Sequence, residues 1–193
     1  MVDQGAAVIE PLHPQEGLHG SVRPRRPQGL QGAGRAYVFS AAAGRWGQTA
    51  ELAGRDTQAG DNFGFSVAGS GGQVLVGAPW HRAGTAYVFS ASKGEWHQTA
   101  ELTSRGTQMG DKFGWSVAVG TGLVVVGAPG ADAGRAYLFS QAGRGWYPAA
   151  ELVGPTAPGS YFGTALAVSG TAVVIGANGC DAATGAAWAT TLS

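Results

Sequence analysis

The sequence predicts an all-β fold built from repeats, and three observations carry that prediction. The chain of 193 residues repeats itself about every fifty residues: Ala-Tyr-Val-Phe-Ser at 36–40 and 86–90 becomes Ala-Tyr-Leu-Phe-Ser at 136–140. Each period holds four short segments of strand character, separated by glycine-rich turns. Helical periodicity is absent, and the 34 glycines interrupt every candidate helix.

The strand segments follow one another in the same order in every period. They lie near 35–40, 45–52, 63–68 and 73–78, then near 84–90, 95–102, 113–119 and 123–128, then near 134–140, 145–152, 162–168 and 172–177. A thirteenth segment, Ala186 to Leu192, resembles a worn copy of the first, with Trp188 where Tyr137 stood.

The segments are of two kinds, and the difference predicts how the sheets pack. Those at 73–77, 123–127 and 172–176 are almost continuously apolar, which is typical of strands buried on both faces. The segment that begins at Arg45 alternates and carries charge, as an exposed strand does. Four-stranded sheets, each sandwiched between its neighbours, are the blades of a β-propeller. A β-solenoid is the alternative, but its repeats are usually shorter.

Some residues return with the period, and we interpret them as structural. They are Phe63, Gly64, Gly77, Pro79, Trp96, Asp111, Phe113, Gly114, Gly127, Pro129, Phe162 and Gly163. The pattern of Phe-Gly, then Gly-Ala-Pro, then Gly before Ala-Tyr resembles FG-GAP repeats, the units of the integrin α propeller and of many bacterial repeat proteins. The resemblance covers about 34–192. It implies a non-enzymatic binding or adhesion scaffold for protein or cell-surface ligands, located outside the cell or on its surface.

The calcium loops of the integrin type are missing, so we expect no cofactor. The stretches that would hold them, at 68–73, 118–123 and 168–172, contain no acidic residue. Calcium takes about six to eight oxygen ligands, several of them usually carboxylates.

Composition excludes several classes of partner. The formal net charge is zero, so we expect no nucleic-acid partner. No apolar run reaches the roughly 20 residues of a membrane helix, which predicts no membrane insertion. Cys180 is the one cysteine, so an intrachain disulfide is excluded. The N-terminus lacks the apolar core of a signal peptide, which leaves the localisation open.

One loop breaks the period and is our candidate ligand loop. Trp80, His81 and Arg82 stand where the next copy has Gly130, Ala131 and Asp132. Loops carry binding functions, although neutral drift in an exposed turn is the competing interpretation. No catalytic constellation is visible, so we expect that the protein is not an enzyme.

Other recurrent residues have a structural interpretation as well as a functional one. Asp61 and Asp111 are interpreted as turn aspartates rather than metal ligands, since a lone carboxylate is a poor cation site. Trp46, Trp96 and Trp146 are interpreted as anchors between blades, with sugar stacking as the alternative.

The expected organisation has two parts. Residues 1–33 do not follow the period and are proline-rich, which predicts a disordered leader. Residues 34–193 form the repeats, at about 34–83, 84–133 and 134–184, with a final strand at 185–193.

Three units do not close a propeller, which typically needs about four to eight blades. We therefore expect a homo-oligomer that completes the ring, a fragment of a longer protein, or an open stack that is unstable. A carbohydrate-binding, lectin-like propeller and a gene fragment without a function of its own are the alternative interpretations.

Overall fold

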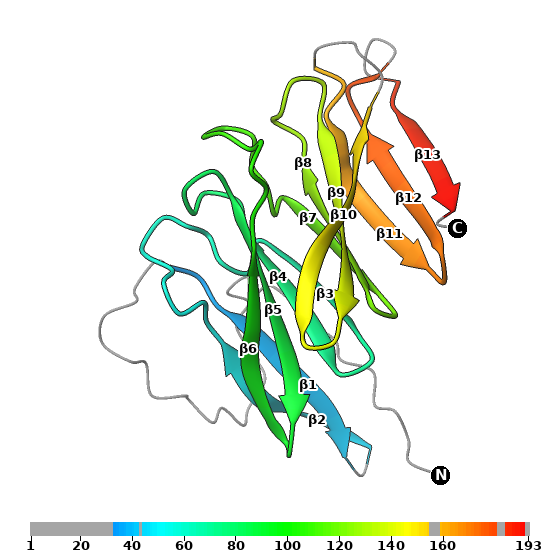
Figure 1. The fold of residues 1–193 in the computed structure, drawn as a ribbon. Coiled ribbons are helices and arrows are strands. Elements are labelled where there is room, and N and C mark those ends of the chain that lie inside the picture. Colours follow the sequence, from blue (N-terminus) through cyan, green and yellow to red (C-terminus); the bar gives the residue numbers. More distant parts are fainter. Residues whose placement is uncertain (1–32, 43, 155–158, 181–183, 192–193) are drawn as a thin grey trace.

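The computed structural model describes residues 33–42, 44–154, 159–180 and 184–191, and it confirms the all-β prediction (Figure 1). Within these residues there are thirteen strands, and they follow the expected order. They are β1 (Ala36–Ala42), β2 (Arg45–Leu52), β3 (Ser66–Ser70), β4 (Gln73–Ala78), β5 (Thr85–Ser92), β6 (Glu95–Leu102), β7 (Ser116–Gly120), β8 (Leu123–Ala128), β9 (Arg135–Ala142), β10 (Gly145–Val153), β11 (Phe162–Ser169), β12 (Ala172–Ala177) and β13 (Ala186–Thr191).

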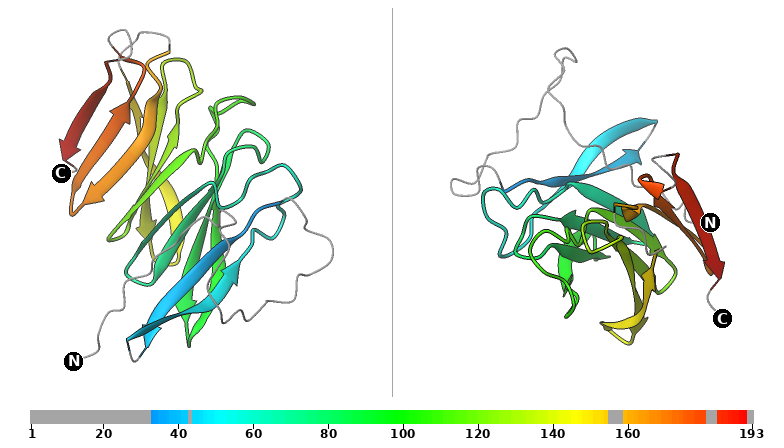
Figure 2. Two further views of the ribbon diagram at one scale, coloured as in Figure 1. Left: turned by 180° about the vertical axis from the view of Figure 1, so that it is seen from behind. Right: turned by 90° about the horizontal axis from the view of Figure 1, so that it is seen from above.

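The strands form four antiparallel sheets, each from strands consecutive in the chain: β1–β2, β3–β6, β7–β10 and β11–β13. The sheets lie one behind another along the molecule, as in an open row of propeller blades (Figures 1 and 2). Among the described residues, no helix is long and apolar enough to cross a membrane.

The sheets begin at a different point of the period from the repeats we expected. The repeat at about 34–83 contains the pair β1–β2 and the first two strands of the next sheet. A period has no intrinsic starting point, and pairing decides the frame. Val76 on β4 pairs with Tyr87 on β5, so the position 83/84 lies within a sheet. The pair β1–β2 therefore corresponds to the outer strands β5–β6, and β13 corresponds to β5.

Burial follows the two kinds of strand. Every residue of β8 is buried, as are all but the first of β4, because each of these strands has a neighbouring sheet on both faces. Strands β2 and β10 lie at the outside and are mostly exposed. The same register shift recurs in the three outer strand pairs β1–β2, β5–β6 and β9–β10. It lies near Val38, Val88 and Pro148. Such bulges increase the local twist.

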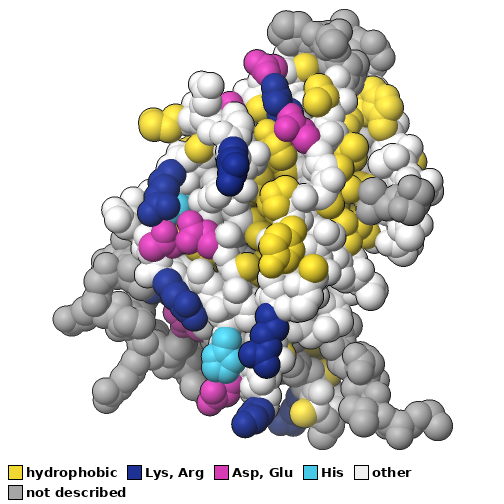
Figure 3. All heavy atoms as spheres, viewed as in Figure 1, with side chains coloured by type: hydrophobic (Ala, Val, Ile, Leu, Met, Phe, Trp, Pro, Cys, Tyr) yellow, Lys and Arg dark blue, Asp and Glu magenta, His cyan; other side chains and the backbone are white. Residues whose placement is uncertain are grey.

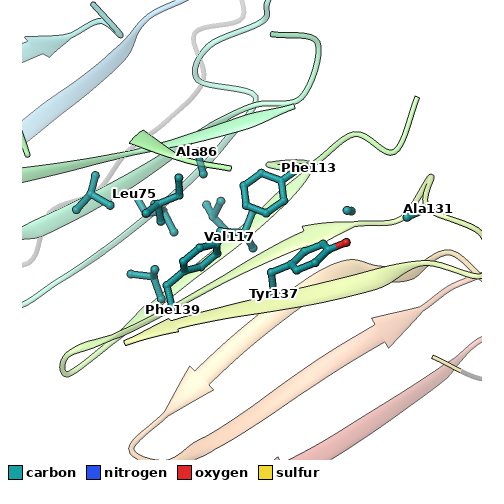
Figure 4. Packing of buried hydrophobic residues seen from close by; sticks show 12 residues of the cluster. Leu75, Ala86, Phe113, Val117, Ala131, Tyr137 and Phe139 are labelled. Carbon is teal, nitrogen blue, oxygen red and sulfur yellow. The ribbon is translucent and has the colours of Figure 1, made fainter. Parts of the chain in front are cut away.

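Three apolar clusters fill the three junctions between successive sheets. Figure 4 shows the central one, where Phe113, Tyr137 and Phe139 face Leu75 and Ala86 across the junction. Two of the recurrent tryptophans pack at the edges of such clusters, Trp96 on the first and Trp146 on the second. Trp46, on the sheet that begins the described part, is 56% exposed. The expected leader lies outside the described residues except for Ala33, which is buried.

The Phe-Gly pairs link each sheet to the one before it. The amide of Phe63 donates to the carbonyl of Ala33, just before β1, at 2.9 Å, whereas that of Gly64 donates at 3.1 Å to the carbonyl of Gly77 on β4, within its own sheet. Parallel bridges of the same kind join Gly84 to Phe113 and Gly134 to Phe162. Each ring thereby enters the apolar junction beside its own backbone link.

Candidate functional site

The structure separates the three residues of the candidate ligand loop, which follows β4. The Trp80 ring joins other aromatic rings, the His81 side chain is buried, and the Arg82 side chain is 69% exposed. Arg82 and its counterpart Asp132 both have positive φ, at 56° and 48°. The backbone turn is therefore kept between the repeats while its side chains change.

Trp80 belongs to an exposed aromatic cluster with Phe65 and Trp115. The ring centroid of Phe65 lies 5.1 Å from that of Trp80 and 4.6 Å from that of Trp115, and the two indoles are 5.7 Å apart. Phe65 is 43% exposed and Trp80 is 42% exposed. The Lys112 ammonium lies 4.8 Å from the Trp115 ring and 5.9 Å from the Trp80 ring, in cation–π geometry.

The rings of this cluster come from two sheets. Phe65 and Trp115 each follow a Phe-Gly pair, just before β3 and β7, so the docking of those pairs fixes their positions. Exposed aromatic rings held in fixed positions offer apolar area at a small cost in conformational entropy, which suits ligand binding.

His81 lies at the centre of a second group, the histidine cluster. His81 Nδ1 is 2.7 Å from Asp61 Oδ2, and His81 Nε2 is 3.1 Å from Asp56 Oδ2. The Tyr87 hydroxyl donates to Asp56 Oδ1 at 2.9 Å. Glu101 on β6 completes the cluster: one ligand atom each from Asp56, His81 and Glu101 lie within 4.8 Å of one another.

Arg82 bridges the two outer carboxylates of the cluster. Its Nη2 atom is 3.4 Å from Asp56 Oδ2, and its Nη1 atom is 3.8 Å from Glu101 Oε1. Asp56 and Glu101 also line an open groove of about 360 Å³ together with Arg55 and Gln98. The cluster is thus buried at His81 and open to solvent at its carboxylates.

The cluster changes the acidity of two of its members. Burial opposes the ionisation of Asp56, but the hydrogen bond from Tyr87 and the charge of His81 outweigh it and lower the pKa of Asp56. Burial, and then the hydrogen bond to Asp56, raise the pKa of Tyr87 well above its usual range. The tyrosine is therefore neutral and the aspartate ionised at neutral pH.

The next repeat supplies an internal comparison for the histidine cluster. Fifty positions later, Asp56, His81 and Arg82 are replaced by Gly106, Ala131 and Asp132. Asp61, Tyr87 and Glu101 keep their types, as Asp111, Tyr137 and Glu151. The three changes lie in two separate loops, and they converge on one point in space.

Asp61 and Asp111 both have the turn role. Each carboxylate accepts a hydrogen bond from the backbone amide three residues earlier, at 2.5 Å from Gln58 and 2.8 Å from Gln108. Asp61 also accepts from His81, a role that its counterpart lacks because Ala131 replaces the histidine.

Sequence reasoning missed Asp56, Phe65 and Trp115 as members of the two groups. Asp56 was detectable, because comparison of the repeats shows a carboxylate against Gly106. The aromatic pair was not, since Phe65 and Trp115 are counterparts of one another in successive copies and only the fold brings them to Trp80.

A second, apolar groove lies at the other end of the described part. Its volume is about 640 Å³, and Leu152, Val153, Phe162, Ile175 and Trp188 are among its lining residues. Figure 3 shows apolar side chains gathered on the part of this face over β10 and the last sheet, whereas most of the charged side chains in this view lie towards the first two sheets.

Comparison with known proteins agrees with the geometry of the sheets. The family model described as FG-GAP repeat matches residues 46–89 and 96–139. A search of curated proteins gave no match. The matched segments begin in the outer strands β2 and β6 and end in β5 and β9, so each contains one Phe-Gly docking element.

Proposed function

The chain is an FG-GAP repeat protein, and on that premise we propose that it is a non-enzymatic module that binds a protein or cell-surface ligand through its aromatic cluster. The proposed location is outside the cell or on its surface. The observation that carries the proposal is the exposure of Phe65 and Trp80 in a cluster held between two sheets.

The aromatic cluster supports this function better than other surfaces do. The recurrent residues of the Phe-Gly and Gly-Ala-Pro elements are used in docking sheets together. Trp80 departs from the repeat, whose next copy has Gly130, and nothing in the docking scheme requires it. The ammonium of Lys112 adds one positive charge beside the rings, which suits a ligand with a carboxylate or another acceptor group.

Carbohydrate is the second candidate ligand, and the same cluster favours it. Indole faces stack on the apolar C–H faces of sugar rings, and the Lys112 ammonium has hydrogen atoms to donate to hydroxyl groups. A protein ligand and a carbohydrate ligand would therefore bind at the same aromatic cluster, and different probes are needed to detect them.

Trp80→Ala tests the proposal, with Trp46→Ala as the matched control. Trp46 is equally an exposed tryptophan, but it lies on β2 outside the cluster. The purified chain and both variants are applied to a glycan array and to an array of immobilised cell-surface proteins. A central tryptophan contributes about 2 kcal/mol or more, so we expect binding to weaken about thirtyfold in Trp80→Ala and to persist in Trp46→Ala.

The possible outcomes distinguish protein binding, carbohydrate binding and the absence of binding through this cluster. Signals on the protein array that disappear with Trp80→Ala support protein recognition, and signals on the glycan array that disappear support carbohydrate recognition. Blank arrays, or signals that survive in Trp80→Ala, contradict the use of this cluster.

A further inference from the structure

We propose that the histidine cluster is a binding site for a divalent transition-metal ion, zinc above all, with His81, Asp56 and Glu101 as its ligands. Their ligand atoms lie within 4.8 Å of one another, and a small movement of Glu101 brings them around one ion. One imidazole and two carboxylates suit zinc, which accepts nitrogen and oxygen ligands at about 2.0–2.2 Å. Calcium prefers a shell of oxygen atoms alone, so the imidazole selects against it.

Asp61 holds the His81 ring in an orientation that suits metal binding through Nε2. Metal-binding histidines usually donate their other ring N–H to a carboxylate, which fixes the tautomer and the ring orientation. The 2.7 Å contact between His81 Nδ1 and Asp61 Oδ2 has this geometry. In the metal-free site Nε2 donates to Asp56 Oδ2, at 3.1 Å, so an ion that binds between these two atoms takes the place of the Nε2 proton.

Tyr87 positions the carboxylate of Asp56 in a similar way. Its hydroxyl donates to Oδ1 and leaves Oδ2 as the oxygen that faces His81 Nε2. Tyr87 is fully buried and lies on β5, so this orientation rests on the core of a complete sheet. Two of the three ligands are thereby fixed before an ion arrives, which lowers the entropic cost of binding.

Arg82 acts as the cation of the site when no metal is bound. Its guanidinium contacts the carboxylates of Asp56 and Glu101 and partly neutralises the charges that an ion would neutralise. The Arg82 side chain is 69% exposed and can leave into solvent, and the groove beside Asp56 and Glu101 gives an ion access. Metal binding and the Arg82 contacts therefore compete.

The test is titration of the purified 193-residue chain with ZnCl₂ by calorimetry and with CoCl₂ by visible absorption. We expect one ion per chain at the cluster. Glu101→Gln and His81→Gln each lower the affinity at least about tenfold, because a charged or nitrogen ligand is lost. Arg82→Ala raises the affinity, because the competing cation is removed. Glu151→Gln is the matched control and leaves the affinity unchanged, since Ala131 stands where the histidine stands.

Glu101→Gln keeps the test decisive if His81→Gln fails to fold, because the Glu101 side chain is 34% exposed and lies at the rim of β6. The cobalt spectrum adds a second readout, since an imidazole ligand and low coordination number intensify its visible bands. Absence of zinc binding by the wild-type chain at millimolar ion overturns the proposal. Binding that is equally strong in Glu101→Gln also overturns it, because the ion then lies elsewhere, for example at the surface pair Glu95 and His97. Neither result affects the proposed role of the aromatic cluster.

Discussion

Asp56 shows how one residue that departs from a repeat acquires partners from several neighbouring elements. Its counterpart is Gly106, so the same turn forms in the next copy without a carboxylate. In the first copy, the carboxylate accepts from Tyr87 and contacts both His81 and Arg82. The buried Tyr87 hydroxyl thereby gains a charged acceptor. A hydrogen bond to a charged group is stronger than one between neutral groups.

The lowered pKa of Asp56 predicts a stability that falls at acidic pH. A carboxyl group whose folded pKa lies below its unfolded value of 3.8 contributes stability above that value and loses it as pH falls through the folded pKa. We expect Asp56→Asn to remove this dependence below about pH 4. The contribution is about 1 kcal/mol or less, since a third of the side chain is exposed and water screens it.

Urea unfolding of the wild-type chain and Asp56→Asn between pH 3 and pH 6, in the presence of a chelator, measures this effect. Asp111→Asn is the control, because its turn hydrogen bond resembles that of Asp61 but it has no contact with a histidine. Equal pH slopes for the wild-type chain and Asp56→Asn would show that the cluster does not perturb this carboxyl group.

At the scale of residues, the sequence shows which positions depart from the repeat, but it does not show which residues they contact. Comparison of the repeats alone shows that Trp80, His81 and Arg82 depart from the pattern. It does not show that Trp80 joins the aromatic cluster while His81 and Arg82 join the histidine cluster. A side chain's direction depends on the turn, and the partners of Trp80 and His81 come from loops before β3 and β7 and from β5 and β6. No local pattern encodes contacts between sheets.

At the scale of elements, the recurrent docking of the Phe-Gly pair explains why the period keeps its glycines. The carbonyl oxygen of Gly114 accepts from the Ser66 hydroxyl at 2.8 Å, and a Cβ atom on Gly77 would lie 2.0 Å from that oxygen. The next junction repeats this with Ser116 and Gly127 around the carbonyl of Gly163. The Gly-Ala-Pro element of one sheet is therefore the receptor for the Phe-Gly element of the next.

This geometry predicts that Gly77→Ala and Gly127→Ala disrupt the junctions, whereas Gly176→Ala is tolerated. Gly176 occupies the same position on β12, but the nearest atom to its Cβ position is the Ala165 methyl at 3.3 Å. Overpacking against backbone costs about 1–3 kcal/mol or more, while added bulk with room to adjust costs little. Chemical denaturation of the three variants measures the difference. A Gly176→Ala variant as unstable as Gly77→Ala would contradict the docking explanation.

The elements themselves follow closely from the sequence, but the sheet frame does not. Continuous apolar segments flanked by turns mark β4 and β8 because burial on both faces demands them. A repeat gives no information on which strand starts a sheet, because a shift by two strands preserves every local pattern. The pairing of Val76 with Tyr87 places β4 and β5 in one sheet, and only the folded structure shows it.

At the scale of the whole molecule, each sheet packs only against its neighbours, so stability is distributed as in a linear array. The two middle sheets have a junction on each face, whereas β1–β2 and β11–β13 each have one among the described residues. The last sheet shows this in its surface, since Val174 is 41% exposed and Trp188 is 37% exposed. The middle sheets should therefore open least often.

Amide hydrogen exchange tests this gradient. We expect the slowest exchange in β4, β5, β8 and β9 and exchange about a hundredfold faster or more in β2 and β13, because local opening there breaks few apolar contacts. Measurement at two protein concentrations extends the test to the expected homo-oligomer. If copies of the chain cover one another's terminal sheets, protection in β2 and β13 rises with concentration, while the middle sheets stay unchanged. Exchange that is slow and equal in all four sheets at low concentration would contradict the linear array, because it requires the molecule to open as a single unit.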